Sequence, residues 1–276
     1  ESKSIKIIFT TYQSSKVTIE GSKDFTFDFA IMDEAHKTVG HEDKQKAQII
    51  SQKKIKIKKR LFMTATERLF RKHKNREEYL SMDDINTYGK IIYQLSFKRA
   101  IESEPQIISD YKVITFGVSS PDIEAIYKSN KFIQLKKEID DNITGREFAT
   151  AIALRKAMKQ YEISNAISFH RSISRAKNFQ KQQDYISKVY NEYGGIKSFH
   201  VSGKMSTNLR ANQMRSFSKS KKALMTNARC LTEGVDLPAI DCVVFTDPKR
   251  SKIDIVQAAG RALRLSPGKK FGYILI

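Results

Sequence analysis

Cysteine is scarce in this sequence. The 276 residues include two cysteines, Cys230 and Cys242, too few for a disulfide framework. The five histidines form no cluster with cysteine at the spacing of a structural zinc site. The composition therefore excludes a small protein held together by disulfides or zinc, and it favours a reduced, cytoplasmic setting.

Long apolar runs are also absent. No stretch approaches the roughly 18 apolar residues that a membrane-spanning helix needs, and no long basic amphipathic helix is evident. Acidic residues are outnumbered, because 50 Lys and Arg against 30 Asp and Glu give a formal net charge of +20. We expect such a basic chain to bind a polyanion, most simply nucleic acid, and not a membrane.

Short apolar runs alternate with longer amphipathic stretches along the chain, which predicts an α/β fold with parallel sheets. The length fits about two domains, which we place at residues 1–97 and 98–276. The basic run at residues 53–60 is predicted to be a solvated loop, with a phosphate-facing patch as the alternative. The predicted strands are 5–9, 27–32, 60–64, 111–118, 166–170, 197–202, 223–226, 242–246 and 271–276, and the predicted helices are 146–161, 172–190, 207–218 and 253–263.

Two adjacent carboxylates follow the second predicted strand. Met32 ends the strand, and Asp33, Glu34, Ala35 and His36 come next. A carboxylate at the carboxyl end of a parallel strand sits where ligands bind in such sheets. Asp33 can hold a magnesium ion through water, and Glu34 can orient and deprotonate an attacking water. A strand end with solvated charges is the alternative.

Two further strand ends carry candidate residues. Thr64 and Thr66 end the next strand, and their hydroxyls can relay hydrogen bonds between a hydrolytic site and a neighbouring domain. A later loop contains Gly234, which permits close backbone approach, and Asp236, which can take a ribose hydroxyl or order the loop. Ordinary strand threonines and a Gly-containing turn are the alternatives.

The last segment reads Gln257-x-x-Gly260-Arg261-x-x-Arg264. We expect Arg261 and Arg264, three residues apart on a helix, to present both guanidinium groups on one face. Such groups bind phosphate oxygens in forked geometry and can stabilise charge on a transferring γ-phosphoryl group. Two surface arginines making salt bridges are the alternative.

In this order, the four segments resemble motifs II (the DEAH box), III, V and VI of superfamily-two helicases. Finer features resemble the motor subunits of type I, type III and type ISP restriction enzymes. Those features lie at residues 10–14, 33–38, 63–66, 88–89 and 227–236. The resemblance extends from Thr10 to Arg264, nearly the whole chain.

The resemblance implies two RecA-like domains, with ATP and Mg²⁺ in the cleft between them and nucleic acid lying across both. The residues it implies for catalysis are Asp33, Glu34, His36, Gln257, Arg261 and Arg264, with Asp33 also at the metal. Those it implies for the nucleotide are Thr64, Thr66, Gly234 and Asp236. Those it implies for nucleic acid are Thr10, Tyr12, Gln13, His170, Arg171, Ser202, Gly203 and Thr226. For His170, a buried strand histidine is the alternative.

The implied activity is that of an ATP-dependent helicase or translocase moving on duplex DNA in a restriction or DNA-processing system. Methyltransferase or specificity subunits would be further partners. Two alternatives stay open: a non-catalytic nucleic-acid-binding remnant, and an RNA helicase. The presence of Asp33, Glu34, Arg261 and Arg264 together favours a motor, whereas DNA over RNA rests on the resemblance alone.

Two features depart from the family pattern. Glu67 stands where relatives usually have proline, which we interpret as a loop variant. No window fits the phosphate loop, G-x-x-x-x-G-K followed by Ser or Thr; Gly203-Lys204, for example, is followed by Met205. In the family that loop precedes the segment of Thr10. We therefore expect a fragment whose first RecA-like domain is truncated at its N-terminus and which does not hydrolyse ATP alone.

Overall fold

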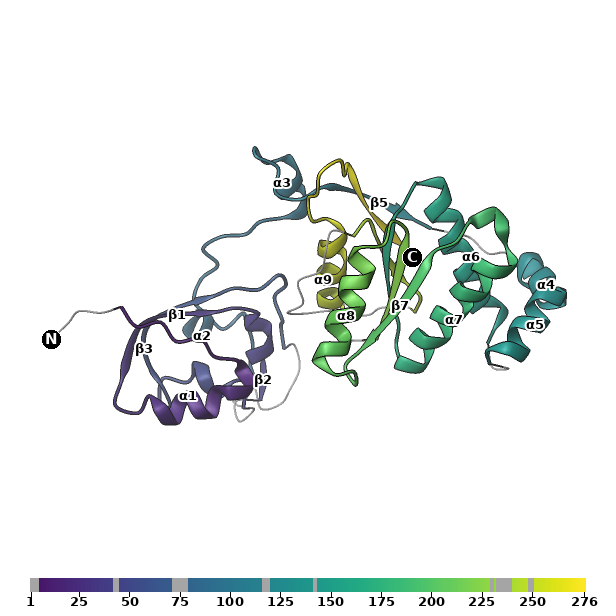
Figure 1. Cartoon of the computed structure of the whole chain (residues 1–276). Helices are drawn as coiled ribbons and strands as arrows, with labels where there is room; N and C mark the ends of the chain where they lie inside the picture. The colour runs from purple at the N-terminus through teal and green to yellow at the C-terminus, as the bar shows by residue number, and fades with distance from the viewer. Residues whose placement is uncertain are drawn as a thin grey trace. The chain divides into compact units, whose positions relative to one another are not determined.

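The computed structural model describes residues 5–41, 45–70, 79–115, 120–140, 143–228, 231, 240–247 and 251–276. The chain divides into two compact units, Glu1–Gln94 and Leu95–Ile276 (Figure 1). In the described part of the chain, no helix has the length and apolar character needed to cross a membrane.

The first unit is built on two parallel strands, β1 (Thr26–Met32) and β3 (Lys56–Phe62). Met32 lies opposite Phe62, so both strands end at the same edge. The core on this pair includes Ile50 and Tyr88. The other elements are η1 (Tyr12–Ser14), α1 (Ser15–Gly21), η2 (Ala35–Thr38), β2 (Gly40–His41), η3 (Gln48–Ile50), β4 (Tyr79–Leu80) and α2 (Ile85–Tyr88).

Two expectations for this unit are wrong. Residues 5–9 form no strand, because no described strand pairs with them and an apolar run needs a partner for its backbone hydrogen bonds. The basic run is a loop only at residues 53–55, because β3 begins at Lys56, within it. Ile55 and Ile57 are buried while Lys56 and Lys58 stay exposed. This alternation with a period of two gives a strand whose lysines point to solvent.

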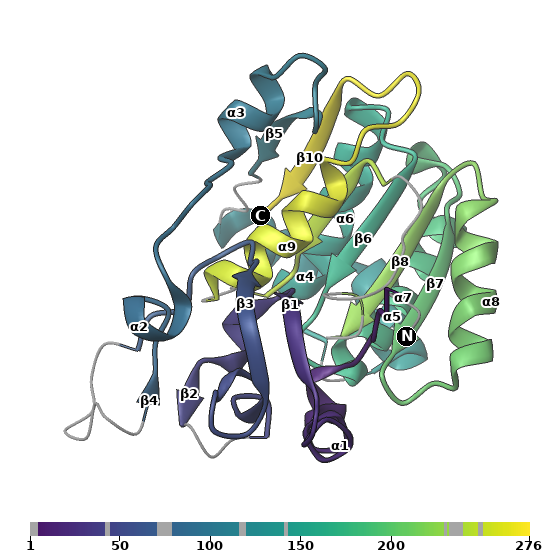
Figure 2. The ribbon, with the colours of Figure 1, turned by 90° about the vertical axis from the view of Figure 1, so that its left-hand side faces the viewer.

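Six strands, all paired in parallel, form the sheet of the second unit (Figure 2). Their order is β5-β10-β9-β6-β8-β7, which confirms the predicted α/β fold with a parallel sheet. All six were predicted to within a few residues, although residues 116–118 of the predicted strand 111–118 lie outside the described part. The strands are β5 (Asp110–Ile114), β6 (Asn165–Phe169), β7 (Lys197–Ser202), β8 (Ala223–Ala228), β9 (Cys242–Phe245) and β10 (Phe271–Leu275).

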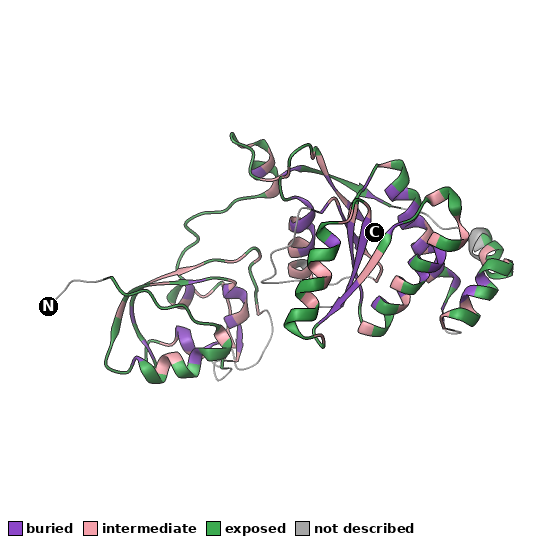
Figure 3. Ribbon diagram, viewed as in Figure 1, coloured by how far each residue is buried: buried purple, intermediate pink, exposed green. Residues whose placement is uncertain are grey.

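Helices cover both faces of this sheet. One core cluster includes Phe148 and Ile186 from two helices, and a second cluster includes Phe217 and Ala258 from two others. Figure 3 shows the buried residues concentrated on the strands and on the sides of the helices that face them. These four helices were predicted, and they are α6 (Gly145–Gln160), α7 (Ile173–Val189), α8 (Thr207–Ser218) and α9 (Lys252–Ala262).

Several short helices of the second unit were not predicted from the sequence. Their apolar faces are narrow: α5 buries only Phe132 and Leu135 among six polar or charged residues. Short helices with so little apolar periodicity depend on tertiary packing and leave a weak sequence signal. They are α4 (Ser120–Lys128), α5 (Asn130–Glu138) and the 3₁₀ turn η5 (Asn191–Tyr193), whereas α3 (Phe97–Glu102) lies at the predicted domain boundary.

Candidate active site

The register of β1 and β3 places the segment of Asp33 and Glu34 beside the segment that begins with Thr64. The Met63 N–H donates to the Met32 carbonyl, and the Ala35 N–H donates to the Met63 carbonyl, each at 2.9 Å. The backbone ladder therefore continues past both strand ends. As a result, the turn that holds Asp33 and Glu34 lies against the segment that begins with Thr64.

Asp33 and Glu34 form a sharp turn directly after β1. Glu34 has a left-handed backbone, with φ 50° and ψ 44°, which is uncommon for a residue with a Cβ atom. The Glu34 N–H donates to Asp33 Oδ1 at 2.8 Å. Asp33 is exposed and Glu34 is half-buried. The two neighbouring carboxylates therefore lie in different surroundings, one in solvent and one beside buried His36.

His36 connects Glu34 to Thr64. Its Nδ1 lies 3.2 Å from Glu34 Oε2 and 3.1 Å from Thr64 Oγ1. The Thr64 hydroxyl has a single hydrogen, which it donates to the Thr66 carbonyl at 2.9 Å. Thr64 Oγ1 must then accept from His36, so the imidazole carries its proton on Nδ1. One N–H group thus faces both the Glu34 carboxylate and the threonine segment.

Tyr12 supports the same turn from the preceding segment. Its hydroxyl donates to the Asp33 carbonyl at 2.7 Å. Burial raises the pKa of the Tyr12 phenol, and the negative charge of Asp33 raises it further, so the phenol is protonated at neutral pH. Thr10 and Gln13 are exposed. Nucleic-acid contacts by these three residues stay predictions, and for Tyr12 a role in holding the turn is visible.

The residues of the second unit predicted to contact nucleic acid differ in accessibility. Arg171 and Gly203, which follow β6 and β7, are exposed. Ser202 and Thr226 are 2% and 0% exposed. The Thr226 hydroxyl lies 3.0 Å from His200 Nδ1, so it already has a partner within the sheet. Only the first two present accessible groups in this structure, and the assignment of all four stays a prediction.

His170 follows β6 and is 2% exposed. Its Nε2 lies 2.8 Å from Ser168 Oγ, and its Nδ1 lies 2.8 Å from Thr246 Oγ1. Because the Thr246 hydroxyl donates to the Phe169 carbonyl at 3.0 Å, His170 donates from Nδ1 to Thr246. Both ring nitrogens are engaged inside the protein. This geometry agrees with the buried strand histidine that was the alternative, and a direct contact with nucleic acid stays a prediction.

The last predicted segment falls at the end of α9. Gln257 and Arg261 are four residues apart in this helix and share a face, and Arg261 is 8% exposed. The helix ends at Ala262, and Arg264 lies beyond it and is exposed. The helical spacing that was expected to place Arg261 and Arg264 on one face therefore does not apply to Arg264.

Residues that sequence reasoning missed fix the end of α9. The Lys269 ammonium donates to the carbonyls of Ala262 and Arg264, the latter at 3.0 Å. A cation at this position also complements the negative end of the helix dipole. Burial lowers the pKa of Lys269. Beneath the helix end, a Cβ atom on Gly272 would lie 2.2 Å from the Ala262 carbonyl oxygen, so only glycine fits.

Two predicted residues, Gly234 and Asp236, lie outside the described residues. Across the described ranges, no group of three or more His, Cys, Asp or Glu side chains could hold a metal ion. Magnesium is commonly held through water and one or two carboxylates, and the exposed oxygens of Asp33 fit that chemistry. Magnesium binding by Asp33 stays a prediction.

Comparisons with known proteins give two domain matches. Residues 149–266 match the helicase conserved C-terminal domain, and residues 1–69 match the res subunit of type III restriction enzymes. A probable helicase of African swine fever virus is 24% identical over 274 residues, which are 98% of this chain and 28% of the viral protein. The chain thus spans between a quarter and a third of that relative.

Two solved structures of restriction enzymes are similar to this chain. The type ISP restriction-modification enzyme LlaBIII, solved bound to DNA, matches with a TM-score of 0.73 and 28% identity, over 96% of this chain and 19% of that one. A fragment of an HsdR subunit of a type I restriction enzyme from Vibrio vulnificus YJ016 shares the fold, with a TM-score of 0.61 and 20% identity, over 96% and 46% of the two chains.

The matches to a helicase C-terminal domain and to a restriction-enzyme res subunit agree with the resemblance to superfamily-two helicases, and they confirm the expected pair of RecA-like domains. A type ISP restriction-modification enzyme is among its structural neighbours and residues 1–69 match a type III res subunit, which confirms the narrower resemblance to restriction enzymes drawn from the motifs.

Proposed function

We propose that the protein containing this chain is an ATP-dependent motor that translocates on duplex DNA in a restriction or DNA-processing system. The observation that carries the proposal is the contact of His36 with both Glu34 and Thr64. A buried histidine that joins a carboxylate after one strand to a hydroxyl after the next is a means of coupling a hydrolytic group to its surroundings. A remnant without catalysis has no need of this arrangement.

In this proposal, Glu34 is the base that orients and deprotonates the attacking water. His36 places its Nδ1 3.2 Å from Glu34 Oε2, close enough to attract the carboxylate. Asp33, with exposed oxygens at the carboxyl end of β1, would hold Mg²⁺ through water, and the bound ion would neutralise phosphate charge. Tyr12 fixes the backbone between these carboxylates through the Asp33 carbonyl.

The second unit would supply the cationic groups. Arg261 and Arg264 are proposed to stabilise the charge that develops on the transferring phosphoryl group, with Gln257 on the same face of α9 as Arg261. Thr64 and Thr66, together with Gly234 and Asp236, are proposed to contact the nucleotide or to order the loops around it.

Binding to nucleic acid is supported by the net charge of +20. DNA is favoured because the type ISP neighbour was solved bound to DNA. Arg171 and Gly203 are the accessible candidates of the second unit, and Thr10 and Gln13 are those of the first. A methyltransferase or specificity subunit as partner belongs to the same proposal.

The test is steady-state ATPase activity of the intact protein with duplex DNA. Glu34→Gln keeps the size of the side chain but removes the base, so we expect ATP binding to persist and kcat to fall about 100-fold or more. Glu20→Gln is the matched control, because Glu20 is an exposed carboxylate of α1. Near-normal turnover of Glu34→Gln would contradict the proposal, and so would an intact protein that binds DNA without ATPase activity.

Displacement of a triplex-forming strand from linear duplex DNA tests the mode of action. A translocase is expected to displace the third strand in an ATP-dependent manner, and Glu34→Gln is expected to abolish this. ATPase stimulation by RNA alone would instead identify the protein as an RNA helicase.

A further inference from the structure

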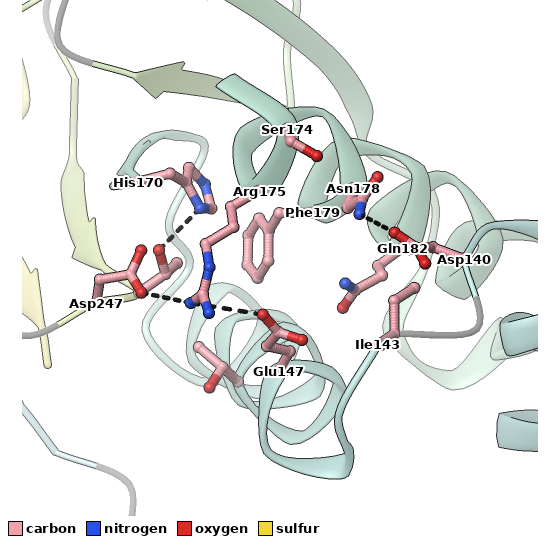
Figure 4. Close-up of a pocket in the computed structure, with 12 residues that line it drawn as sticks. Asp140, Ile143, Glu147, His170, Ser174, Arg175, Asn178, Phe179, Gln182 and Asp247 are labelled. Atoms are coloured by element: carbon pink, nitrogen blue, oxygen red, sulfur yellow. Dashed lines mark hydrogen bonds and ion pairs between the residues drawn. The ribbon is translucent and has the colours of Figure 1, made fainter. Parts of the chain in front are cut away.

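A pocket of about 310 Å³ opens in the second unit, between α6, α7 and the ends of β6 and β9 (Figure 4). None of the residues proposed for hydrolysis lines it, and of those proposed for nucleic acid only His170 does. That volume holds about ten water molecules at about 30 Å³ each, which is room for a small organic group.

The pocket carries an excess of negative charge. Asp140, Glu147 and Asp247 line it against one cation, Arg175, so three negative charges face one positive charge in a protein with a net charge of +20. Arg175 Nη1 lies 2.6 Å from Asp247 Oδ1 and 3.5 Å from Glu147 Oε1. The pocket therefore already accommodates a guanidinium group at one end.

The other end of the pocket offers acceptors. Figure 4 shows Asp140, Asn178 and Gln182 across Phe179 from the Arg175 group. A carboxylate can accept several hydrogen bonds through its two oxygens, and Asp140 Oδ2 accepts one from Asn178 Nδ2 at 2.8 Å. No second cation lines this end among the described residues.

Gln182 is the observation that points to a ligand. It is 2% exposed, and its Oε1 is buried without a hydrogen-bond partner among the described residues. Figure 4 shows its amide extending into the pocket. A buried acceptor without a partner costs free energy, so such groups are rare unless something else donates to them. A ligand with N–H groups would satisfy it.

The remaining walls favour a cation with a flat or apolar body. Phe179 and Ile143 line the pocket between the polar groups. An aromatic ring attracts a cation placed over its face, and guanidinium stacks on such rings more readily than ammonium does.

We propose that this pocket binds a guanidinium group, carried either by a small free molecule or by an arginine side chain of a partner protein. The group would donate to Gln182 Oε1 and to the Asp140 carboxylate, and it would lie against Phe179. An anion is excluded by the surplus of carboxylates. A neutral ligand would lack the charge attraction to these carboxylates.

The first experiment compares two ligands on the purified wild-type protein by calorimetric titration. Propylguanidinium carries the proposed group, and propylurea has nearly the same shape without the charge. We expect saturable binding of propylguanidinium and at least about tenfold weaker binding of propylurea. Equal affinity for the two ligands, or no saturable binding of propylguanidinium, overturns the proposal without any variant.

Two variants then locate the site. Asp140→Asn keeps an acceptor for Asn178 but removes the charge, and Gln182→Met keeps the side-chain length but removes Oε1. We expect each to weaken propylguanidinium binding about tenfold. Glu102→Gln, an equal charge change on exposed α3, is expected to stay within about twofold of wild type. Wild-type affinity in both folded pocket variants contradicts the proposed site. If one variant fails to fold, the other variant and the comparison of propylguanidinium with propylurea still test the proposal.

A third titration separates the two sources of the guanidinium group. It uses a blocked pentapeptide with one central arginine and its citrulline counterpart. Tighter binding of the arginine peptide than of propylguanidinium supports a partner protein, and weaker binding supports a small free molecule. Equal binding of the arginine and citrulline peptides excludes the partner.

Discussion

At the scale of single residues, the direction of one hydrogen bond defines the role of His36. Because Thr64 donates to the Thr66 carbonyl, His36 must donate from Nδ1 to Thr64, and the same N–H lies 3.2 Å from Glu34 Oε2. A side chain without an N–H in this position cannot donate to Thr64. His36 and Thr64 should therefore act as one unit and not as two independent contributors.

A double-mutant cycle on the intact protein tests that coupling. We expect His36→Ala and Thr64→Ala each to lower DNA-stimulated kcat about tenfold or more, and the double variant to be hardly worse than either single one. Asparagine can place an amide N–H near the position of the histidine Nδ1, so His36→Asn should recover part of the activity. Fully additive losses would contradict the shared network.

Gly272 is a second position where one added atom, a Cβ, should change the stability of the protein. Gly272→Ala would place a methyl group 2.2 Å from the Ala262 carbonyl oxygen, so either β10 or the end of α9 must shift. We expect a loss of about 1–3 kcal/mol in the free energy of unfolding, measured by urea denaturation. Gly195→Ala is the control, because a Cβ atom there has no neighbour within 4 Å. Equal stability of the two variants would disprove the close approach.

At the scale of elements, Arg155 ties two helices and a loop together. This side chain of α6 is 1% exposed. It donates to Gln183 Oε1 and to the Gln183 carbonyl of α7, both at 2.6 Å, and to the Gly194 carbonyl at 3.0 Å. Burial lowers its pKa to about 10. A buried cation held by neutral acceptors is tolerated only because its donors are well supplied with partners.

Removing that cation should loosen the packing of α6 on α7. Arg155→Met fills a similar volume but leaves several buried acceptors without donors, so we expect a loss of about 3 kcal/mol in the free energy of unfolding. Arg155→Lys should recover only part of that loss, because an ammonium group cannot reach all the acceptors that the forked guanidinium group reaches. Arg146→Met, on an exposed position of α6, is expected to change stability by less than about 0.5 kcal/mol. Chemical denaturation at unchanged m-value measures all three.

The elements also show what the sequence can predict. β6, β8 and β9 were found because buried parallel strands are nearly continuous apolar runs, as at Ala166–Ile167 and Val243–Val244. Residues 5–9 have the same composition, but whether such a run forms a strand depends on a partner elsewhere in the chain. Only the end of β3, residues 60–62, fell within a predicted strand, because exposed lysines alternate with the apolar residues in its first half.

The candidate site was predictable in part for a similar reason. Motif order identified Asp33, Glu34 and His36, because the residue types follow from the chemistry. The contact of His36 with Thr64 could not be derived from the sequence, because it depends on the register of β1 against β3. The pocket near Gln182 could not be predicted at all, since its carboxylates come from segments about 100 residues apart, at Asp140, Glu147 and Asp247.

At the scale of the whole molecule, charge and the absent phosphate loop define the behaviour of this chain by itself. We expect residues 1–276 to bind duplex DNA, with an affinity that falls steeply with salt at a log–log slope of about −0.9 per neutralised phosphate. We expect no ATP hydrolysis, because these residues contain no Gly-rich loop to cradle the β- and γ-phosphates. Fluorescence anisotropy across a salt series and phosphate release measure the two. DNA-stimulated phosphate release above background would contradict the second expectation.

The strand order of the second unit also has a consequence during synthesis. Among the described residues, β5 pairs with β10 alone, and Asp110 of β5 lies opposite Phe271. The first strand of the sheet therefore emerges from the ribosome 271 − 110 = 161 residues before its neighbour. At roughly 5–20 residues per second, Asp110–Ile114 waits roughly 10–30 s without a partner strand. During that interval the nascent chain exposes an edge that another chain could join, so chaperone occupancy should be highest just before β10 emerges.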